Sequence, residues 1–224
     1  MAFYALRKKI LSFTGGAEEF LNGLSANAWD APKNAFLDVQ GRIVATADQV
    51  RVGGDEVWEA VEEPFAERLL GHLQNHLRLS DTRAAEVGGI RAYFDLDGTA
   101  PAGEGEYRLP QVSGQILLTP RERRADVSEE AFTRFRLDHR LPLQGADYDR
   151  EMLLNLGDDA YVSFSKGCFL GQEIIARVRY RGRPPRRLEV ARLDPADARI
   201  ERMTSRVRDE ETGKIRGFLF LENT

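Results

Sequence analysis

The sequence predicts an α+β fold, because helix-like and strand-like segments mix along its 224 residues without a regular order. Apolar residues recur at helical spacing over 17–24 and again from Pro64 to Leu77. Two β-prone runs flank Gly41, which is typical of a hairpin. These segments lack the strand–helix–strand rhythm of a doubly wound sheet, and we therefore favour α+β.

In the first half, the sequence predicts a short amphipathic helix, a hairpin with a third strand, and a longer helix. These elements fall at 17–24, 35–39 with 42–52, 56–61, and from Pro64 onward. Proline is favoured in a first helical turn. Phe65, Leu69 and Leu73 then share one face, so this helix should pack on the sheet.

The second half begins with short predicted strands, at 90–96, 106–110 and 115–119. A loop rich in Gly, Pro and Ala, residues 98–105, separates the first two. Ser128 is a good helix cap, and Pro142 ends the segment that follows it. The last stretch, 187–220, is typical of a small β unit.

The length allows one large domain or two small ones. We expect a body over 1–183, which could divide into 1–85 and 86–183, and a small β unit over 184–224. Apolar residues make up 42% of the chain, enough for a core and too many for a disordered protein.

The net charge of −4 gives no reason to expect nucleic-acid binding. No apolar run has the length of a membrane span, and the N-terminus lacks the features of a signal peptide. The single cysteine excludes an internal disulfide and fits a reducing compartment. We expect a soluble, cytoplasmic protein without a membrane partner.

The most informative segment surrounds that cysteine, Cys168. A cysteine acts as a nucleophile or metal ligand only as the thiolate, and the ammonium of Lys166 two residues away would favour that form. Gly167 and Gly171 permit close ligand approach, and Gln172 and Glu173 supply hydrogen-bonding groups.

Two ordinary interpretations remain open for this segment. A lone cysteine is usually a small buried apolar residue. The arginines that follow, Arg177 to Arg187, can form a positive wall for an anion, but their alternation with Val178 and Tyr180 also suits a half-buried strand.

The string Lys166-Gly167-Cys168-Phe169-Leu170-Gly171-Gln172-Glu173 resembles the K-G-C-[FY]-x-G-Q-E signature of the YgfZ-type folate-binding proteins, relatives of the glycine-cleavage aminomethyltransferases. The match continues through Ala176-Arg177 and Arg181-Gly182. Weaker likeness covers Gly16 to Gly23, Phe36 to Arg42 and Arg136 to Gly145, and hence most of the chain.

The resemblance implies a folate-binding body followed by a small C-terminal β-barrel, here shortened. It implies tetrahydrofolate or a derivative as cofactor, and a role in making or repairing iron–sulfur enzymes, including one that modifies tRNA. Iron–sulfur enzymes or assembly proteins would be the partners. The residues implied to act directly are Cys168, Lys166, Gln172 and Glu173.

Candidate folate contacts follow from position and chemistry. Glu151 and Glu173 would meet the pterin edge, Phe36 and Phe132 would stack, and Arg177 would meet the anionic tail. Gly167 and Gly171 would line the site.

The chain departs from the family pattern at two places. Related aminomethyltransferases carry an acidic residue just after the hairpin glycine, whereas Gly41 to Thr46 contains no carboxylate. This argues against aminomethyl transfer and favours a maturation factor, while a folate-dependent one-carbon (aminomethyl) transferase stays an alternative. The opening T-N-D-V motif of the family is replaced by Ala26-Asn27-Ala28-Trp29.

Two other functions compete with this interpretation. Phe94 to Thr99 resembles the D-x-D-G-T motif of Mg²⁺-dependent haloacid-dehalogenase-type phosphatases, in which Asp95 and Asp97 would be nucleophile and acid/base. A turn between strands explains the same residues. The run from Arg177 to Arg187, with Phe169 and Tyr180 nearby, also permits RNA binding.

A metal site is not expected. His72 and His76 lie four residues apart on the helix from Pro64, but no third ligand completes a recognisable set.

Overall fold

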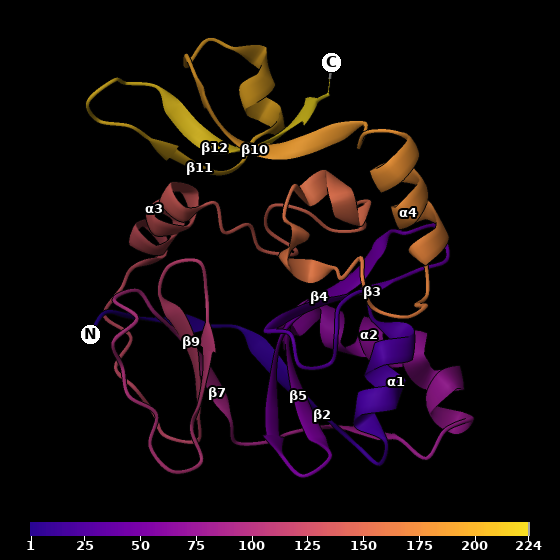
Figure 1. The fold of residues 1–224 in the computed structure, drawn as a ribbon. Helices are drawn as coiled ribbons and strands as arrows, with labels where there is room; N and C mark the ends of the chain where they lie inside the picture. Colours follow the sequence, from indigo (N-terminus) through magenta and orange to yellow (C-terminus); the bar gives the residue numbers. More distant parts are fainter. Residues whose placement is uncertain (224) are drawn as a thin grey trace.

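Two antiparallel sheets facing one another form the body of the protein in the computed structural model, which describes residues 1–223 (Figure 1). The five-stranded sheet has the order β3 (Lys33–Leu37), β4 (Ile43–Gly53), β5 (Glu56–Glu62), β2 (Lys8–Thr14) and β6 (Arg83–Glu86). The four-stranded sheet has the order β1 (Phe3–Leu6), β7 (Arg91–Asp95), β9 (Gln115–Thr119) and β8 (Tyr107–Pro110). Ile10 and Trp58 of the first sheet share an apolar core with Phe94 and Ile116 of the second.

Two helices cover the other face of the five-stranded sheet, α1 (Ala17–Leu24) and α2 (Glu63–Arg78). The alternation of side chains along a strand sends Leu11 and Val57 to this face, where they pack with Leu69 and Leu73 of α2. The second core is therefore separate from the one between the sheets, and the sheet is buried on both sides.

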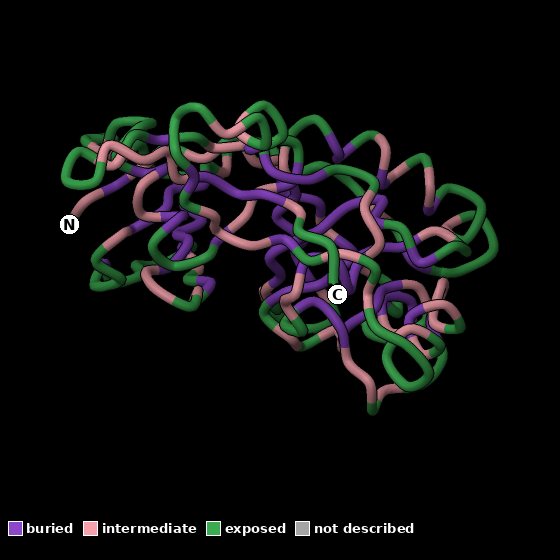
Figure 2. The backbone as a smooth tube through the Cα atoms, turned by 90° about the horizontal axis from the view of Figure 1, so that it is seen from above, coloured by how far each residue is buried: buried purple, intermediate pink, exposed green. Residues whose placement is uncertain are grey.

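The chain then adds α3 (Glu129–His139), α4 (Gln172–Arg181) and a third sheet with the order β10 (Arg186–Leu193), β12 (Ile215–Glu222) and β11 (Thr204–Arg208). Short 3-10 helices lie at Leu153–Leu156, Asp159–Tyr161 and Ala198–Arg202. In Figure 1 this sheet caps the body beside α3 and α4. Figure 2 shows the buried segments in the interior and the exposed ones along the outer loops.

The mixed fold and most elements agree with the sequence prediction. The strands β3, β4, β5, β7, β8 and β9, and the helices α1, α2 and α3, lie within a few residues of the expected positions. Ser128 caps α3 by accepting a hydrogen bond from the amide of Ala131 at 3.2 Å. No helix in residues 1–223 is long and apolar enough to cross a membrane.

Three features differ from the prediction. The C-terminal unit is an open three-stranded sheet, and no closed barrel is found among the described residues. The N-terminal residues form the strands β1 and β2, which the mixed composition of that segment concealed. Residues 172–181 form a helix rather than a strand, because Ile175 and Val178, one turn apart, pack against the core on the same side.

Candidate functional site

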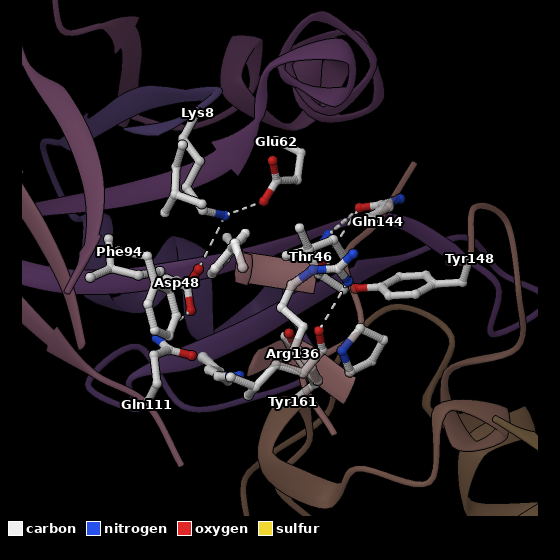
Figure 3. Close-up of a pocket in the computed structure, with 18 residues that line it drawn as sticks. Lys8, Thr46, Asp48, Glu62, Phe94, Gln111, Arg136, Gln144, Tyr148 and Tyr161 are labelled. Carbon is white, nitrogen blue, oxygen red and sulfur yellow. Dashed lines mark hydrogen bonds and ion pairs between the residues drawn. The ribbon is translucent and has the colours of Figure 1, made fainter. Parts of the chain in front are cut away.

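A cavity lies where the two sheets meet the segment 141–161, and its lining carries an unusual density of charged and polar groups (Figure 3). The cavity is narrow, with a volume of about 40 Å³ open to the centres of water molecules. The polar lining residues are Lys8, Lys33, Thr46, Asp48, Glu62, Gln111, Arg136, Gln144, Tyr148 and Tyr161. A concave site with convergent polar groups is the usual form of a small-molecule site.

A buried ion triad forms one wall of the cavity (Figure 3). The Nζ atom of Lys8 lies 2.7 Å from Oε1 of Glu62 and 3.2 Å from Oδ2 of Asp48, and the Lys8 side chain is only 4% exposed. Gln111 donates to Oδ1 of Asp48 at 2.9 Å. The three residues come from neighbouring strands of one sheet, and strand alternation turns all three toward the cavity.

The charges of this triad stabilise one another. Burial disfavours the ammonium of Lys8, but the carboxylates of Glu62 and Asp48 outweigh it and raise the pKa of Lys8. Burial also pushes the pKa of Asp48 upward, yet Lys8 and Lys33 outweigh it and the pKa of this carboxyl is lowered. Lys8 and Asp48 therefore stay ionised at neutral pH, and both carboxylates of the triad already have a cationic partner.

A hydrogen-bonded group at Thr46 forms the next part of the wall. Its hydroxyl lies 2.8 Å from the hydroxyl of Tyr148, and its amide donates to Oε1 of Gln144 at 2.8 Å. Burial raises the pKa of Tyr148 well above 10, so this phenol stays neutral. The stretch after the hairpin glycine thus presents the hydroxyl of Thr46, and the nearest carboxylate in the strand is that of Asp48.

Arg136 closes the cavity from α3. Its Nη1 donates to Oδ2 of Asp147 at 2.5 Å and its Nη2 to Oγ of Ser205 at 2.7 Å. Asp147 also accepts from Thr204 and Ser205 of β11. This buried pair therefore joins α3, the cavity wall and the C-terminal sheet. The Nε–H of Arg136 is buried without a partner in residues 1–223 and remains available as a donor.

Aromatic rings provide the apolar surface of the cavity. Phe132 stacks on Tyr4 with ring centres 4.1 Å apart and an interplanar angle of 16°. The ammonium of Lys33 lies 5.1 Å from the ring centre of Tyr161. A flat heterocycle with several hydrogen-bonding edges would find both stacking surface and polar partners here.

The signature loop lies outside the cavity. Lys166 donates from Nζ to the carbonyl oxygens of Ser25 at 2.7 Å and Asn27 at 2.6 Å. Burial lowers the pKa of Lys166 to about 8. Cys168 is exposed, and its thiol is free. Lys166 thus fastens the loop to the 25–27 segment and leaves the thiol open to solvent.

Gly171 sets the direction of the chain after the signature cysteine. Its φ is +83°, and a Cβ there would lie 2.6 Å from the carbonyl oxygen of Asp38. Only glycine fits both the conformation and the contact. Gly171 therefore lets α4 begin directly against the β3–β4 turn.

Asn27 connects this loop to the cavity. While its carbonyl accepts from Lys166, its side-chain amide donates to the carbonyl oxygens of Lys33 at 2.9 Å and Ala160 at 2.8 Å. Lys33 itself and Tyr161, the neighbour of Ala160, line the cavity. A short chain of hydrogen bonds thus runs from the signature loop to the backbone of Lys33, which lines the cavity, and to that of Ala160 beside Tyr161.

Only one of the expected folate contacts lines the cavity, namely Phe132. Phe36 is fully buried in the core below α1 and α2. Glu151 pairs with Arg186 and accepts from Asn155, so it attaches the C-terminal sheet to the body. Glu173 and Arg177 pair with each other at 2.7 Å on the exposed face of α4.

The remaining signature residues serve the loop. Gln172 is the first residue of α4, and its backbone N–H donates to the carbonyl oxygen of Phe169 at 3.2 Å. Gly167 is exposed and has no neighbour within 4 Å of a Cβ placed there. Lys166 and Cys168 therefore lie in one loop, with Gln172 at the start of the helix that follows, and this loop does not line the cavity.

The phosphatase-like motif forms a turn. Asp95 is fully buried at the end of β7, where Oδ2 accepts from the amide of Ala100 at 2.7 Å and from Gln115 at 3.0 Å. Asp97 lies on the surface and pairs with the terminal amine at 3.2 Å. The two carboxylates have separate structural roles, which removes the support for a phosphatase. No group of three or more His, Cys, Asp or Glu residues in the described chain is placed to hold a metal ion.

Sequence reasoning missed the ion triad and the residues around it. One signal was present, because Asp48 interrupts an apolar strand in which aspartate is disfavoured. Lys8 gave no such signal, since lysines are common at chain termini and its partners are 40 and more residues away.

No protein-family model matches the sequence. Among solved structures, the chain is similar to the glycine cleavage system aminomethyltransferase T from Bartonella henselae, with a TM-score of 0.68 and 12% sequence identity. The match covers 99% of this chain and 78% of that one. The fold of the aminomethyltransferase is therefore shared along the whole chain, as the sequence resemblance implied, while the identity is too low to transfer an activity.

Proposed function

We propose that this chain is a YgfZ-type folate-binding protein of the cytoplasm, which holds tetrahydrofolate or a derivative in the central cavity and acts through Cys168 in the assembly or repair of iron–sulfur enzymes. One observation carries the proposal: the loop with the signature cysteine is hydrogen-bonded through Asn27 to Lys33 of a polar, aromatic cavity and to Ala160, the neighbour of the cavity residue Tyr161. The likeness to an aminomethyltransferase fold supports a folate ligand in general.

Within this proposal the cavity residues have distinct tasks. Phe132 and Tyr161 supply flat surfaces for the pterin ring, and Gln111 and Lys33 supply hydrogen bonds at its edge. The unpartnered Nε–H of Arg136 supplies one further donor. These residues replace Glu151, Glu173, Arg177 and Phe36 as candidate contacts.

The occupied state of Asp48 argues against aminomethyl transfer. A carboxylate that already pairs with Lys8 and accepts from Gln111 is poorly placed to serve as a base or to hold a cationic intermediate. The cavity is better suited to binding than to proton transfer, and the thiol of Cys168 is the reactive group that remains.

The exposed thiol of Cys168 fits a transient role. As the thiolate it can be a nucleophile or a metal ligand. One thiolate cannot hold a cluster alone, because clusters generally take four ligands. The other ligands would come from an iron–sulfur client, among them an enzyme of tRNA modification, or from a small thiol.

Calorimetric titration with tetrahydrofolate tests the first half of the proposal. We expect micromolar binding that weakens about tenfold in Lys33→Met, which loses one polar contact of roughly 1.4 kcal/mol, and by about the same factor in Tyr161→Leu, which loses the stacking face. Glu173→Ala is the matched control on the exposed face of α4 and should bind as the wild type does. Equal affinity in all four proteins would place the ligand outside the cavity.

A cellular assay tests the second half. Cells in which Cys168→Ser replaces the wild type should lose activity of iron–sulfur enzymes while the purified variant still folds and binds tetrahydrofolate. Undiminished iron–sulfur enzyme activity in those cells would refute the role of the thiol and leave the folate site unaffected.

A further inference from the structure

The arginines after the signature loop gather on one part of the surface, although the protein as a whole is acidic. Residues 172–192 contain seven arginines and two glutamates, whereas the complete chain has a net charge of −4. Nothing in the proposed folate site uses them, because the cavity lies at the meeting of the two sheets. Such an asymmetry directs an anionic partner to a single face.

The helical conformation of α4 sorts these arginines into two sets. Arg177, Tyr180 and Arg181 are spaced i, i+3 and i+4 and hence share one face of the helix, where all three are exposed. Tyr180 is 71% exposed, which is unusual for so large a ring. An exposed aromatic ring is therefore displayed on the same helix face as two arginines.

The second set lines a cleft between the end of α4 and the C-terminal sheet. Arg179, Arg183 and Arg187 lie around a cleft of about 370 Å³. Gly157 forms part of its wall with φ +68°, and a Cβ there would clash with the side chain of Arg187, which donates to the Gly157 carbonyl at 3.2 Å. The backbone thus leaves room for this guanidinium.

The acidic residues nearby do not neutralise this region. Arg177 lies 2.7 Å from Glu173, Arg179 lies 3.4 Å from Asp159 and Arg187 lies 3.3 Å from Glu189, in pairs whose arginines are about half exposed or more. Exposed pairs of this kind contribute little energy and can exchange their carboxylate for a phosphate. Within residues 1–223, Arg181 and Arg183 have no ion-pair partner.

We propose that α4 and the adjoining cleft form a binding surface for single-stranded nucleic acid. The helix alone is roughly 15 Å long, so its arginines can contact several phosphates of one strand rather than a single small anion. Tyr180 offers a stacking face for a base, a combination with arginine that is typical of sequence-tolerant binding to single strands. An acidic protein partner would also pair with the arginines, but the exposed ring of Tyr180 would add less to its binding than to the binding of a base.

Fluorescence anisotropy with a labelled 12-nucleotide RNA of mixed sequence tests this surface. We expect micromolar binding at 50 mM NaCl, and a plot of log K against log salt concentration with a slope near −3, as about four phosphate contacts would give. Arg181→Gln combined with Arg183→Gln should make the slope less steep by about 1.4. Tyr180→Ala should weaken binding about tenfold, and Tyr180→Phe should bind as the wild type does.

The matched control is Arg91→Gln combined with Arg108→Gln, two exposed arginines of the four-stranded sheet with the same change in charge. This control should keep the wild-type slope, and thermal unfolding should show that all variants fold. The proposal is overturned if the control weakens binding as much as the α4 variant does. It is also overturned if polyglutamate of equal charge competes as well as unlabelled RNA and Tyr180→Ala has no effect.

Discussion

Replacing Lys8 by methionine removes the cation of the ion triad and keeps most of the side-chain volume. Lys8 is 4% exposed and lies within 3.2 Å of carboxylate oxygens of both Glu62 and Asp48. Removing one partner of a buried ion pair typically costs 3–5 kcal/mol, because the remaining charge is left uncompensated. Two carboxylates depend on Lys8, so we expect a loss of about 4 kcal/mol in the free energy of unfolding at pH 7.5.

Urea unfolding followed by tryptophan fluorescence measures this loss, provided that the m-value is unchanged. Lys9→Met is the matched control, because Lys9 pairs with Glu86 at 2.6 Å but is 37% exposed. An exposed pair contributes at most about 1 kcal/mol. Lys8→Met should therefore lower the free energy of unfolding several times more than Lys9→Met does, although the two lysines are neighbours in one strand.

The pH dependence provides a second check on Lys8→Met. Without the ammonium, burial is no longer outweighed at Asp48, so the pKa of this carboxyl in the folded variant rises above that in the unfolded chain. The folded state then binds more protons, so its stability rises as the pH falls. The deficit at pH 5 should be clearly smaller than at pH 8. A loss below 1 kcal/mol, or a deficit independent of pH, would refute the account of the triad.

Two further predictions concern stability. Glu59 is fully buried with neither carboxylate oxygen partnered in the described chain, and burial, with a smaller contribution from the charge of Asp48, raises its pKa well above 4.5. The contribution of Glu59 to stability is thus complete below its unfolded pKa and is lost as the pH rises through its folded pKa. In urea titrations, the free energy of unfolding of Glu59→Met should exceed that of the wild type by about 1–3 kcal/mol at pH 8, but by little at pH 4.5. Gly171→Ala should cost about 1–3 kcal/mol, since its Cβ would meet the carbonyl oxygen of Asp38, whereas Gly23→Ala, with no neighbour within 4 Å, should not destabilise α1.

Local patterns predicted most of the fold. The apolar face of α2, the glycine of the β3–β4 turn and the cap at Ser128 each act within a few residues, so their effect is visible in the sequence. The strand β2 escaped prediction because Lys8 and Lys9 begin it, and the cavity-facing position of Lys8 depends on Asp48 and Glu62. The helix α4 also depends on its context, since its side chains pack on a core that other segments complete.

The site was predicted in part for the same reason. The signature around Cys168 is a contiguous string and can be recognised directly, whereas the cavity draws Lys8, Asp48, Arg136 and Tyr161 from the length of the chain. Chemistry alone suggested Glu151, Glu173 and Arg177 as contacts, yet each has a partner elsewhere. The position of a side chain relative to a cavity follows from strand pairing and is not encoded locally.

The most direct test of the central claim is a crystal structure of the protein with tetrahydrofolate. The account predicts electron density for the pterin ring inside the cavity, against Phe132 or Tyr161 and within hydrogen-bonding distance of Gln111 or Lys33. Density at another site, or an empty cavity in crystals grown with the ligand well above its dissociation constant, would contradict it.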